Sequence, residues 1–69
     1  MKLMVNGKPR EVDAPNGEIG VLDLLERYGV NPRLVAVAIN GDVIPKTEYA
    51  TARIRGGDMV EIVRMVGGG

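Results

Sequence analysis

Three consecutive glycines, Gly67, Gly68 and Gly69, end the 69-residue sequence and are its most informative chemical feature. Glycine has no side chain and reaches backbone angles that other residues avoid, so such a tail can enter a narrow channel and bring its carboxylate to a partner's active site. The alternative is a flexible end without a function, because chain termini are often disordered. Since the glycines directly follow a predicted strand, we interpret residues 67–69 as a flexible functional tail.

The chain lacks the side chains that most enzymes need for catalysis. It has no cysteine, histidine or serine, which excludes a catalytic triad, a Cys–His pair and an imidazole proton shuttle. Thr47 and Thr51 carry the only aliphatic hydroxyls, and no neighbouring residue would clearly act as their base. A soft metal site and the spaced acidic ligands of a calcium loop are also missing. We therefore expect a protein that is not an enzyme and that binds neither a metal nor a cofactor.

The charge and the apolar runs of the chain restrict its partners and its location. Nine basic and nine acidic side chains cancel, which argues against a nucleic-acid binder, because such proteins gain affinity by neutralising phosphates. The longest purely apolar run, residues 34–39, is too short to cross a membrane. The N-terminal segment lacks the apolar region of a secretory signal. We expect no nucleic-acid partner, no membrane association and a cytoplasmic location.

Two further motifs have simpler structural interpretations. Gly56-Gly57 could form a phosphate-binding loop, but no glycine-rich pattern ending in lysine surrounds it, and a strand follows it in place of a helix. We interpret residues 55–58 as a tight turn. Arg53, Arg55 and Arg64 could form a basic patch, although at zero net charge we favour an ordinary solvated surface.

The first half of the chain predicts a hairpin and then a helix. Residues 2–6 form a strand, Asn6-Gly7 favours a type I′ turn, and residues 10–14 form a polar return strand whose charges and neighbouring proline suit a sheet edge. Residues 18–28 predict the helix, ended by a glycine and a later proline. Its apolar stripe has helical spacing and consists of Val21, Leu24, Leu25 and Tyr28.

The second half predicts short strands joined by turns. Residues 34–39 form a buried strand, residues 42–44 a short return strand, and residues 59–66 the last strand; residues 46–51 form a turn or a single helical turn. One helix on one face of a mixed sheet of four to five strands, with the first and last strands parallel at its centre, is an α+β fold of the ubiquitin-like β-grasp type. Residues 1–66 are the predicted domain and residues 67–69 its tail.

The last predicted strand also suggests a binding surface. If Val60 and Ile62 point to the helix, the alternation of a strand turns the residues between them outward. An apolar patch would then lead to the tail, and exposed apolar patches are frequently binding sites. A register shifted by one residue would instead place these side chains in the core. The predicted partner-binding patch consists of Met4, Glu61, Val63, Met65 and Val66.

The chain resembles the ThiS family, the ubiquitin-like sulfur carriers of thiamine biosynthesis. The similar segments are MKLMVNG at 1–7, VAINGDVIPKTEY at 37–49 and GDMVEIVRMVGGG at 57–69. Two positions depart from the family pattern: Lys46 stands where arginine is frequent, and Tyr49 stands where tryptophan is frequent.

The resemblance implies a mechanism. The carboxylate of Gly69 would be adenylated with ATP by a ubiquitin-activating-type adenylyltransferase. Sulfur from a persulfide donor protein would displace AMP, and the resulting thiocarboxylate would supply sulfur to thiazole synthase. ATP would be the partner's substrate, so no cofactor is expected on this chain.

Other functions share parts of this pattern. The small subunit of molybdopterin synthase uses the same tail chemistry, but it tends to be longer and to have a proline before its glycines. Other ubiquitin-like sulfur carriers and protein modifiers also end in glycine, and a modifier would join Gly69 to a lysine. A β-grasp interaction module would act without the tail and would usually continue into a longer chain, whereas this sequence ends at Gly69.

Overall fold

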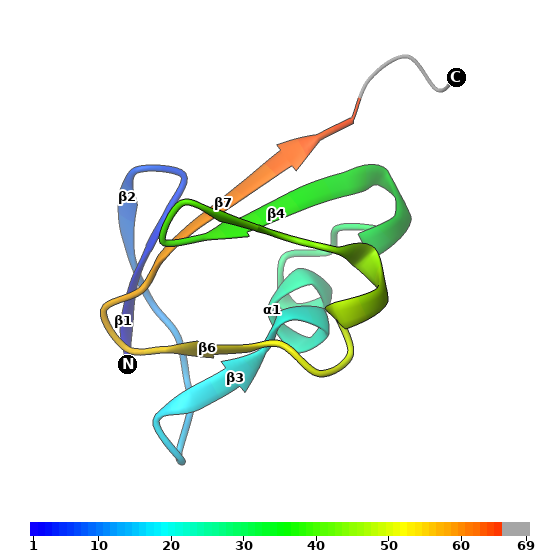
Figure 1. Ribbon diagram of the computed structural model, residues 1–69. Coiled ribbons are helices and arrows are strands. Elements are labelled where there is room, and N and C mark those ends of the chain that lie inside the picture. The colour runs from blue at the N-terminus through cyan, green and yellow to red at the C-terminus, as the bar shows by residue number, and fades with distance from the viewer. Residues whose placement is uncertain (66–69) are drawn as a thin grey trace.

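The computed structural model describes residues 1–65, and Figure 1 shows their arrangement. This part of the chain contains strands, one α-helix and two short 3₁₀ helices, η1 and η2. In chain order the elements are β1 (Lys2–Val5), β2 (Lys8–Glu11), β3 (Glu18–Gly20), α1 (Val21–Arg27), η1 (Pro32–Leu34), β4 (Val35–Ile39), β5 (Asp42–Ile44), η2 (Lys46–Glu48), β6 (Arg53–Arg55) and β7 (Met59–Arg64).

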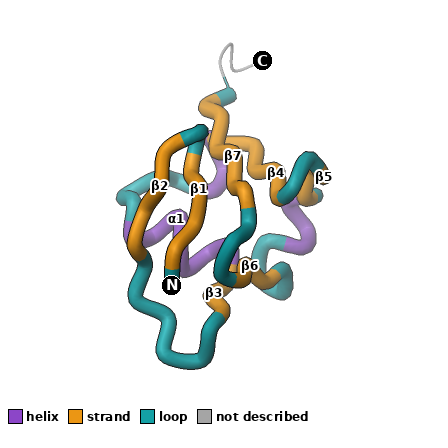
Figure 2. Tube along the Cα trace, turned by 90° about the vertical axis from the view of Figure 1, so that its left-hand side faces the viewer, coloured by secondary structure: helices purple, strands orange, loops and turns teal. Residues whose placement is uncertain are grey.

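The main sheet has five strands in the order β2-β1-β7-β4-β5 (Figure 2). The first and last strands, β1 and β7, lie side by side and are parallel, whereas the other neighbours are antiparallel. Helix α1 packs on one face of this sheet, and the short β3–β6 pair lies below it in Figure 1. The predicted β-grasp fold is therefore confirmed.

The first hairpin turns at Asn6-Gly7, where both residues have positive φ angles of 52° and 80°, as a type I′ turn requires. This two-residue turn places Lys8 directly opposite Val5, so the return strand starts at Lys8. The predicted strand at residues 10–14 was wrong in its bounds for this reason. Strand β2 does form a sheet edge, and all four of its residues are exposed.

The start of the predicted helix was also wrong, because Glu18–Gly20 form strand β3 and not the first helical turn. This strand pairs with β6, which the sequence analysis did not identify. Ile19 and Ile54 face each other in the pair and are 2% and 0% exposed. Burial of this pair favours strand pairing over a longer helix, because fully burying one such side chain contributes roughly 1.5 to 3 kcal/mol.

The C-terminal end of α1 forms as predicted around Gly29. The residue has a φ of 67°, which glycine adopts at low cost, and its N–H donates to the carbonyl of Glu26 at 3.0 Å. The N–H of Val30 donates to Leu25, also at 3.0 Å, and the two bonds together make a Schellman motif. Tyr28 is consequently the cap residue and is 39% exposed, so its predicted place in the buried stripe was wrong.

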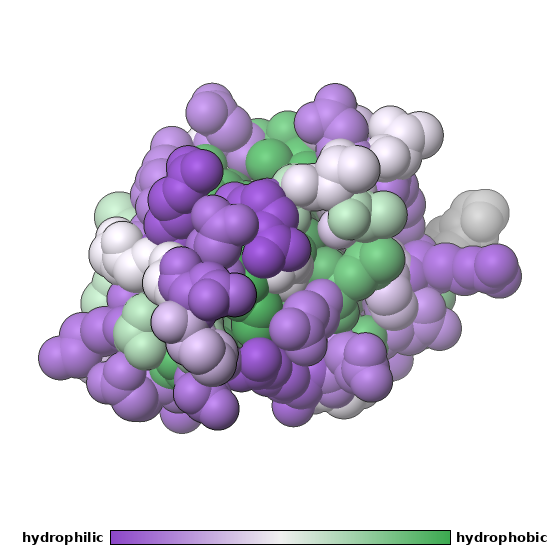
Figure 3. Space-filling model, turned by 90° about the horizontal axis from the view of Figure 1, so that it is seen from below, coloured by the Kyte–Doolittle hydropathy of each residue, from purple (hydrophilic) through white to green (hydrophobic). Residues whose placement is uncertain are grey.

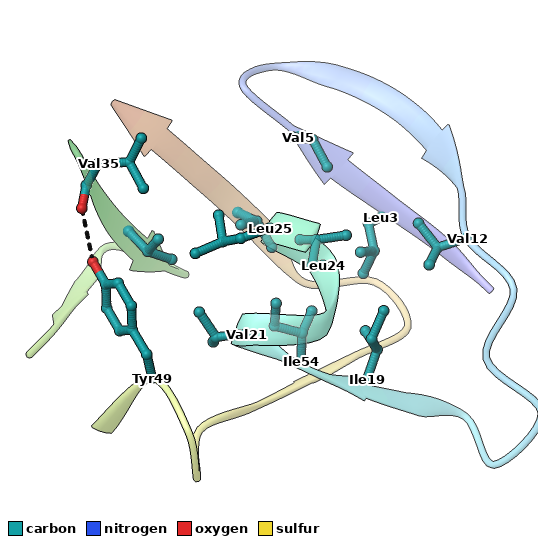
Figure 4. Close-up of a cluster of buried hydrophobic side chains, with 12 residues drawn as sticks. Leu3, Val5, Val12, Ile19, Val21, Leu24, Leu25, Val35, Tyr49 and Ile54 are labelled. Atoms are coloured by element: carbon teal, nitrogen blue, oxygen red, sulfur yellow. Dashed lines mark hydrogen bonds between the residues drawn. The ribbon is translucent and has the colours of Figure 1, made fainter. Parts of the chain in front are cut away.

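The core lies between α1 and the inner face of the sheet (Figure 4). Val21, Leu24 and Leu25 of the predicted helical stripe are each 1% exposed. They belong to one cluster with the inward side chains of the strands. The other members of the cluster are Leu3, Val5, Val12, Ile19, Val35, Val37, Tyr49, Ile54 and Val60.

Tyr49 completes the sheet where β5 ends. Strand β5 pairs with β4 only from Val37 to Ile39, so the carbonyl of Val35 lies beyond it. The Tyr49 hydroxyl donates a buried hydrogen bond of 3.1 Å to that carbonyl (Figure 4). The ring is 4% exposed, so it fills the core and also satisfies a backbone acceptor.

We expect Tyr49→Phe to lower the free energy of unfolding by about 1 to 2 kcal/mol, because the buried carbonyl of Val35 would lose its donor. In a chain of this size the loss corresponds to a fall in Tm of about 5 to 15 °C. Tyr28→Phe is the matched control, since its ring is 39% exposed and its Tm should change little. Equal Tm values for the two variants, measured by thermal unfolding, would contradict the role given to the buried hydroxyl.

Candidate functional site

The candidate site is the surface around β7, the strand that leads to the three glycines. Strand β7 lies between β1 and β4 in the sheet, and its bounds, Met59–Arg64, are shorter than the predicted strand at 59–66. The N–H of Met65 still donates to the carbonyl of Leu34 at 2.8 Å. The predicted site residues Val66, Gly67, Gly68 and Gly69 lie outside the described residues, so the site is built from what precedes them.

The alternation predicted for the last strand is found in β7. Val60 is 1% exposed and Ile62 is half-buried, and both pack with the core. Glu61 between them is exposed, and Val63 is 57% exposed. A one-residue shift of this strand would exchange the inward-facing and the outward-facing side chains. The register that the sequence analysis assumed is therefore the register of the structure.

The remaining described members of the predicted patch also lie near this surface. Met65 is 48% exposed. Met4 is half-buried, and its register partner on β7 is Met59. Exposure and position thus agree with the geometry of the predicted patch, while its role in binding stays a prediction.

The apolar surface is wider than the patch predicted from the sequence. Met59 is 58% exposed and Val43 is 74% exposed, and neither was among the predicted residues. The pairing of β4 with β5 and β7 places two half-buried alanines between them. We call the whole surface the outer apolar face, which consists of Met4, Ala36, Ala38, Val43, Met59, Val63 and Met65.

The sequence contained a signal for Met59 but not by itself for Val43. Met59 is two residues before Glu61, so it shares the outward side of the same strand. Val43 could be placed only by knowing that it faces Ala38, a pairing that depends on the turn between β4 and β5. The small side chains of Ala36 and Ala38 leave the centre of the face flat, which lets a partner approach the sheet closely.

Figure 3 shows the other side of the molecule, seen from below Figure 1. Hydrophilic residues cover most of that side, and hydrophobic atoms show between them. Glu18 lies in the β3–β6 pair and contacts Arg53 at 3.0 Å and Arg55 at 3.5 Å. Arg64 belongs to β7 in the other sheet, so the three arginines named in the sequence analysis are divided between two sheets.

Two asparagine side chains hold β7 in register. The amide group of Asn6 donates to the carbonyl of Ile62 at 3.2 Å and accepts from its N–H at 2.8 Å. Asn40 accepts from the N–H of Met59 at 2.9 Å. Both asparagines were predicted as turn residues, and both have a φ of 52°, but their contacts to β7 were not predicted. These bonds fix which side chains of β7 face outward.

Within residues 1–65, the site offers an apolar contact surface. Residues 1–65 contain no group of three His, Cys, Asp or Glu side chains that could hold a metal ion. None of the helices in the same range has the length and apolar character needed to cross a membrane. What the site provides is an exposed apolar surface on a strand that is hydrogen-bonded along both edges for most of its length.

The chain is similar to known proteins along its whole length. A family model described as the ThiS family matches residues 3–69. The sulfur carrier protein ThiS of Bacillus subtilis is 36% identical over 67 residues, which cover 97% of this chain and 98% of that protein. The crystal structure of a thiamine biosynthesis protein (ThiS) from Geobacter metallireducens has a TM-score of 0.87 and 36% identity, with both chains fully covered.

A longer relative is also similar. A thiazole synthase of Paramagnetospirillum magneticum is 42% identical over 69 residues. The match covers all of this chain but only 20% of that protein, so the chain spans about a fifth of the length of this relative.

Val63→Asp should leave Tm nearly unchanged, because a carboxylate at a position that is 57% exposed stays hydrated. Val60→Asp is the matched change on the same strand and should prevent folding, since it buries an unpaired charge at a position that is 1% exposed. Thermal unfolding of both variants measures the difference. Unfolding by Val63→Asp together with tolerance of Val60→Asp would show that the outer and inner faces of β7 are assigned the wrong way round.

Proposed function

The chain belongs to the ThiS family, and from this premise we propose that it carries sulfur as a thiocarboxylate on Gly69. Members of this family are small sulfur carriers of thiamine biosynthesis, the function that the sequence predicted. The observation that carries the proposal is the match to the Bacillus carrier over nearly the full length of both chains. The proposed chemical steps are those that the resemblance to the ThiS family implies.

The first step is activation of the tail. A free carboxylate is a poor acyl donor, because its oxygen is a poor leaving group. A ubiquitin-activating-type adenylyltransferase would join the carboxylate of Gly69 to AMP and release pyrophosphate from ATP. ATP is in this scheme the substrate of the partner, and this chain holds no cofactor.

The second step is transfer of sulfur. The outer sulfur of a cysteine persulfide on a donor protein would attack the acyl carbon, forming a C–S bond as the bond to AMP breaks. A second thiol would then attack the donor's cysteine sulfur and form a disulfide with it, as the S–S bond to the acyl group breaks and leaves the thiocarboxylate on Gly69. Thiazole synthase would take this sulfur, and the free carboxylate would return to the start of the cycle.

The residues of the chain support this division of work. Cysteine, histidine and serine are absent from the sequence, so the nucleophile and the acid–base groups must come from partners. The sequence match to a thiazole synthase supports a link to that enzyme. We place the outer apolar face against the activating enzyme and thiazole synthase in turn, and the protein in the cytoplasm, where ATP is available.

Incubation with the activating enzyme, ATP and a persulfide donor should exchange one carboxylate oxygen of Gly69 for sulfur. Intact mass spectrometry measures this exchange directly. An unchanged mass, with an activating enzyme shown to load the Bacillus carrier in the same assay, would count against the proposed function.

Deletion of Gly68 and Gly69 is the control for this experiment. The shortened chain should not be adenylated, and its Tm should stay close to that of the parent, because the deleted residues have no side chains to pack. Loading of the shortened chain would mean that another group carries the sulfur. An interaction module that works without its tail would keep its partner binding after the deletion.

Val63→Asp should weaken binding to the activating enzyme and to thiazole synthase by at least about thirtyfold, because its charge would lose water against an apolar partner surface. Leu22→Asp is the matched control: Leu22 is a 40% exposed apolar residue on α1, outside the outer apolar face. Its binding should stay near the parent value in a calorimetric titration. Equal losses for both variants would remove the outer apolar face as the docking surface.

A further inference from the structure

Strand β7 extends past the end of β1 and exposes a short sheet edge. Its residues alternate between hydrogen bonds to β4 and to β1. On the β1 side, Val60 accepts from the backbone of Asn6 at 2.9 Å, and Ile62 is bonded to the Asn6 side chain. Arg64 is the next residue in this alternation, and β1 has ended before it. Within residues 1–65, the N–H and carbonyl of Arg64 therefore have no strand beside them.

The other two edges of the sheet are poorer places for a partner strand. Strand β2 contains Pro9, which has no N–H to donate, and its other residues are charged. Strand β5 has three residues, and none of them lines the groove that borders the edge of β7. The edge of β7 at Arg64 contains no proline. On one side β7 is paired with β4, and on the other side no described strand of this sheet lies beside Arg64.

A groove of about 410 Å³ lies beside this edge, on the inner side of β7. Apolar side chains form much of its wall, including Tyr28, Val30, Leu34 and Ile62. Two of them are substantially exposed, Tyr28 at 39% and Leu34 at 45%. Arg64 is the one charged residue that lines the groove in the described part of the chain, and no carboxylate lines it. The groove thus suits an apolar side chain with an acidic neighbour.

We infer that an extended segment of thiazole synthase pairs with the edge of β7 at Arg64 and fills this groove. The inference deepens the proposed function and rests on it. Side chains two residues apart lie on the same face of a strand, so the segment has an apolar residue for the groove and, two positions away, an Asp or Glu for Arg64. Pairing of this kind holds the strand that leads to the tail while the sulfur-bearing group is in the partner's active site.

Charge argues against a second copy of this chain as the occupant. Two β7 edges that paired around Arg64 would bring two guanidinium groups together on one face, and like charges across a strand pair are destabilising. The groove would then contain two cations and no carboxylate from its lining residues. An acidic segment of another protein supplies the missing charge.

The test is hydrogen exchange at the backbone amide of Arg64. The ¹⁵N-labelled full chain is incubated in deuterated buffer alone or with purified thiazole synthase, then dissociated under quench conditions and read by NMR. We expect the enzyme to slow exchange of the Arg64 amide by at least about tenfold, because a new hydrogen bond protects it. The Glu11 amide serves as the reference, since it lies on the edge strand β2 and belongs neither to the outer apolar face nor to the groove.

A pair of variants separates the charge from the backbone donor. Arg64→Ala removes the guanidinium and keeps the N–H, and it should weaken binding of thiazole synthase about tenfold. Arg64→Pro also removes the N–H and should weaken binding about tenfold further. Tm should stay close to the parent value in both variants, because Arg64 is opposite Val35 in the pairing with β4 but the alternation of the strand turns its N–H away from β4.

The outcomes distinguish this inference from the proposed function. Binding of thiazole synthase without protection of Arg64, or equal affinities of Arg64→Ala and Arg64→Pro, would overturn the inference and leave the proposed function intact. Protection of the Arg64 amide in the free chain would also overturn the inference. If this protection increases with protein concentration, a second copy of the chain occupies the edge. If deletion of Gly68 and Gly69 removes the protection, the chain's own tail occupies it. No binding by the parent chain would overturn both.

Discussion

The parallel contact between β1 and β7 brings residues 2–5 and residues 59–64 together at the centre of the sheet. Direct strand pairing covers only two residues on each side, and the side chain of Asn6 extends it to Ile62. Every inward and outward position on β7 depends on this register, because a shift of one residue would exchange the two faces. The core under the sheet and the outer apolar face are thus two results of one alignment.

A consequence of this arrangement is that strand β7 contributes one face to the core and the other to the outer apolar face. Val60 and Ile62 contribute to the core, while Val63 on the same strand is 57% exposed and belongs to the face that we propose for docking. In the proposed function the chain needs no catalytic side chains of its own, because partner enzymes would supply them. With so little room for a core, residues outside the main strands matter as well, and Tyr49 is buried between η2 and β4 for this reason.

Alternation along a long strand and the chemistry of the turns could be read from the sequence, whereas the pairing of very short strands could not. The apolar alternation of the last strand predicted the outward position of Val63, and the two Asn-Gly turns predicted the hairpins, since both signals are local and strong. The succession of a hairpin and a crossover helix predicted that the first and last strands lie parallel at the centre of the sheet. Strands β3 and β6 have three residues each, too few for a pattern, and Glu18–Gly20 looked like a continuation of the helix. The contacts of Asn6 and Asn40 with β7 depend on tertiary placement, which no local signal encodes. The outward position of Met59 followed from the alternation of its own strand, whereas that of Val43 required its pairing with Ala38 on β4.

The Asn6-Gly7 turn is also a site at which the protein can slowly lose an amide group by deamidation. In an Asn-Gly sequence the glycine nitrogen can attack the side-chain amide, because no side chain hinders it, and the amide nitrogen is lost as ammonia. At Asn6 that nitrogen is the donor to the Ile62 carbonyl, 3.2 Å away, and hydrolysis would replace it with an oxygen that repels the carbonyl. The same hydrogen bonds hold the amide in place and oppose the attack for as long as the strand stays paired. The rate of deamidation thus depends on how often the hydrogen bonds between Asn6 and Ile62 open.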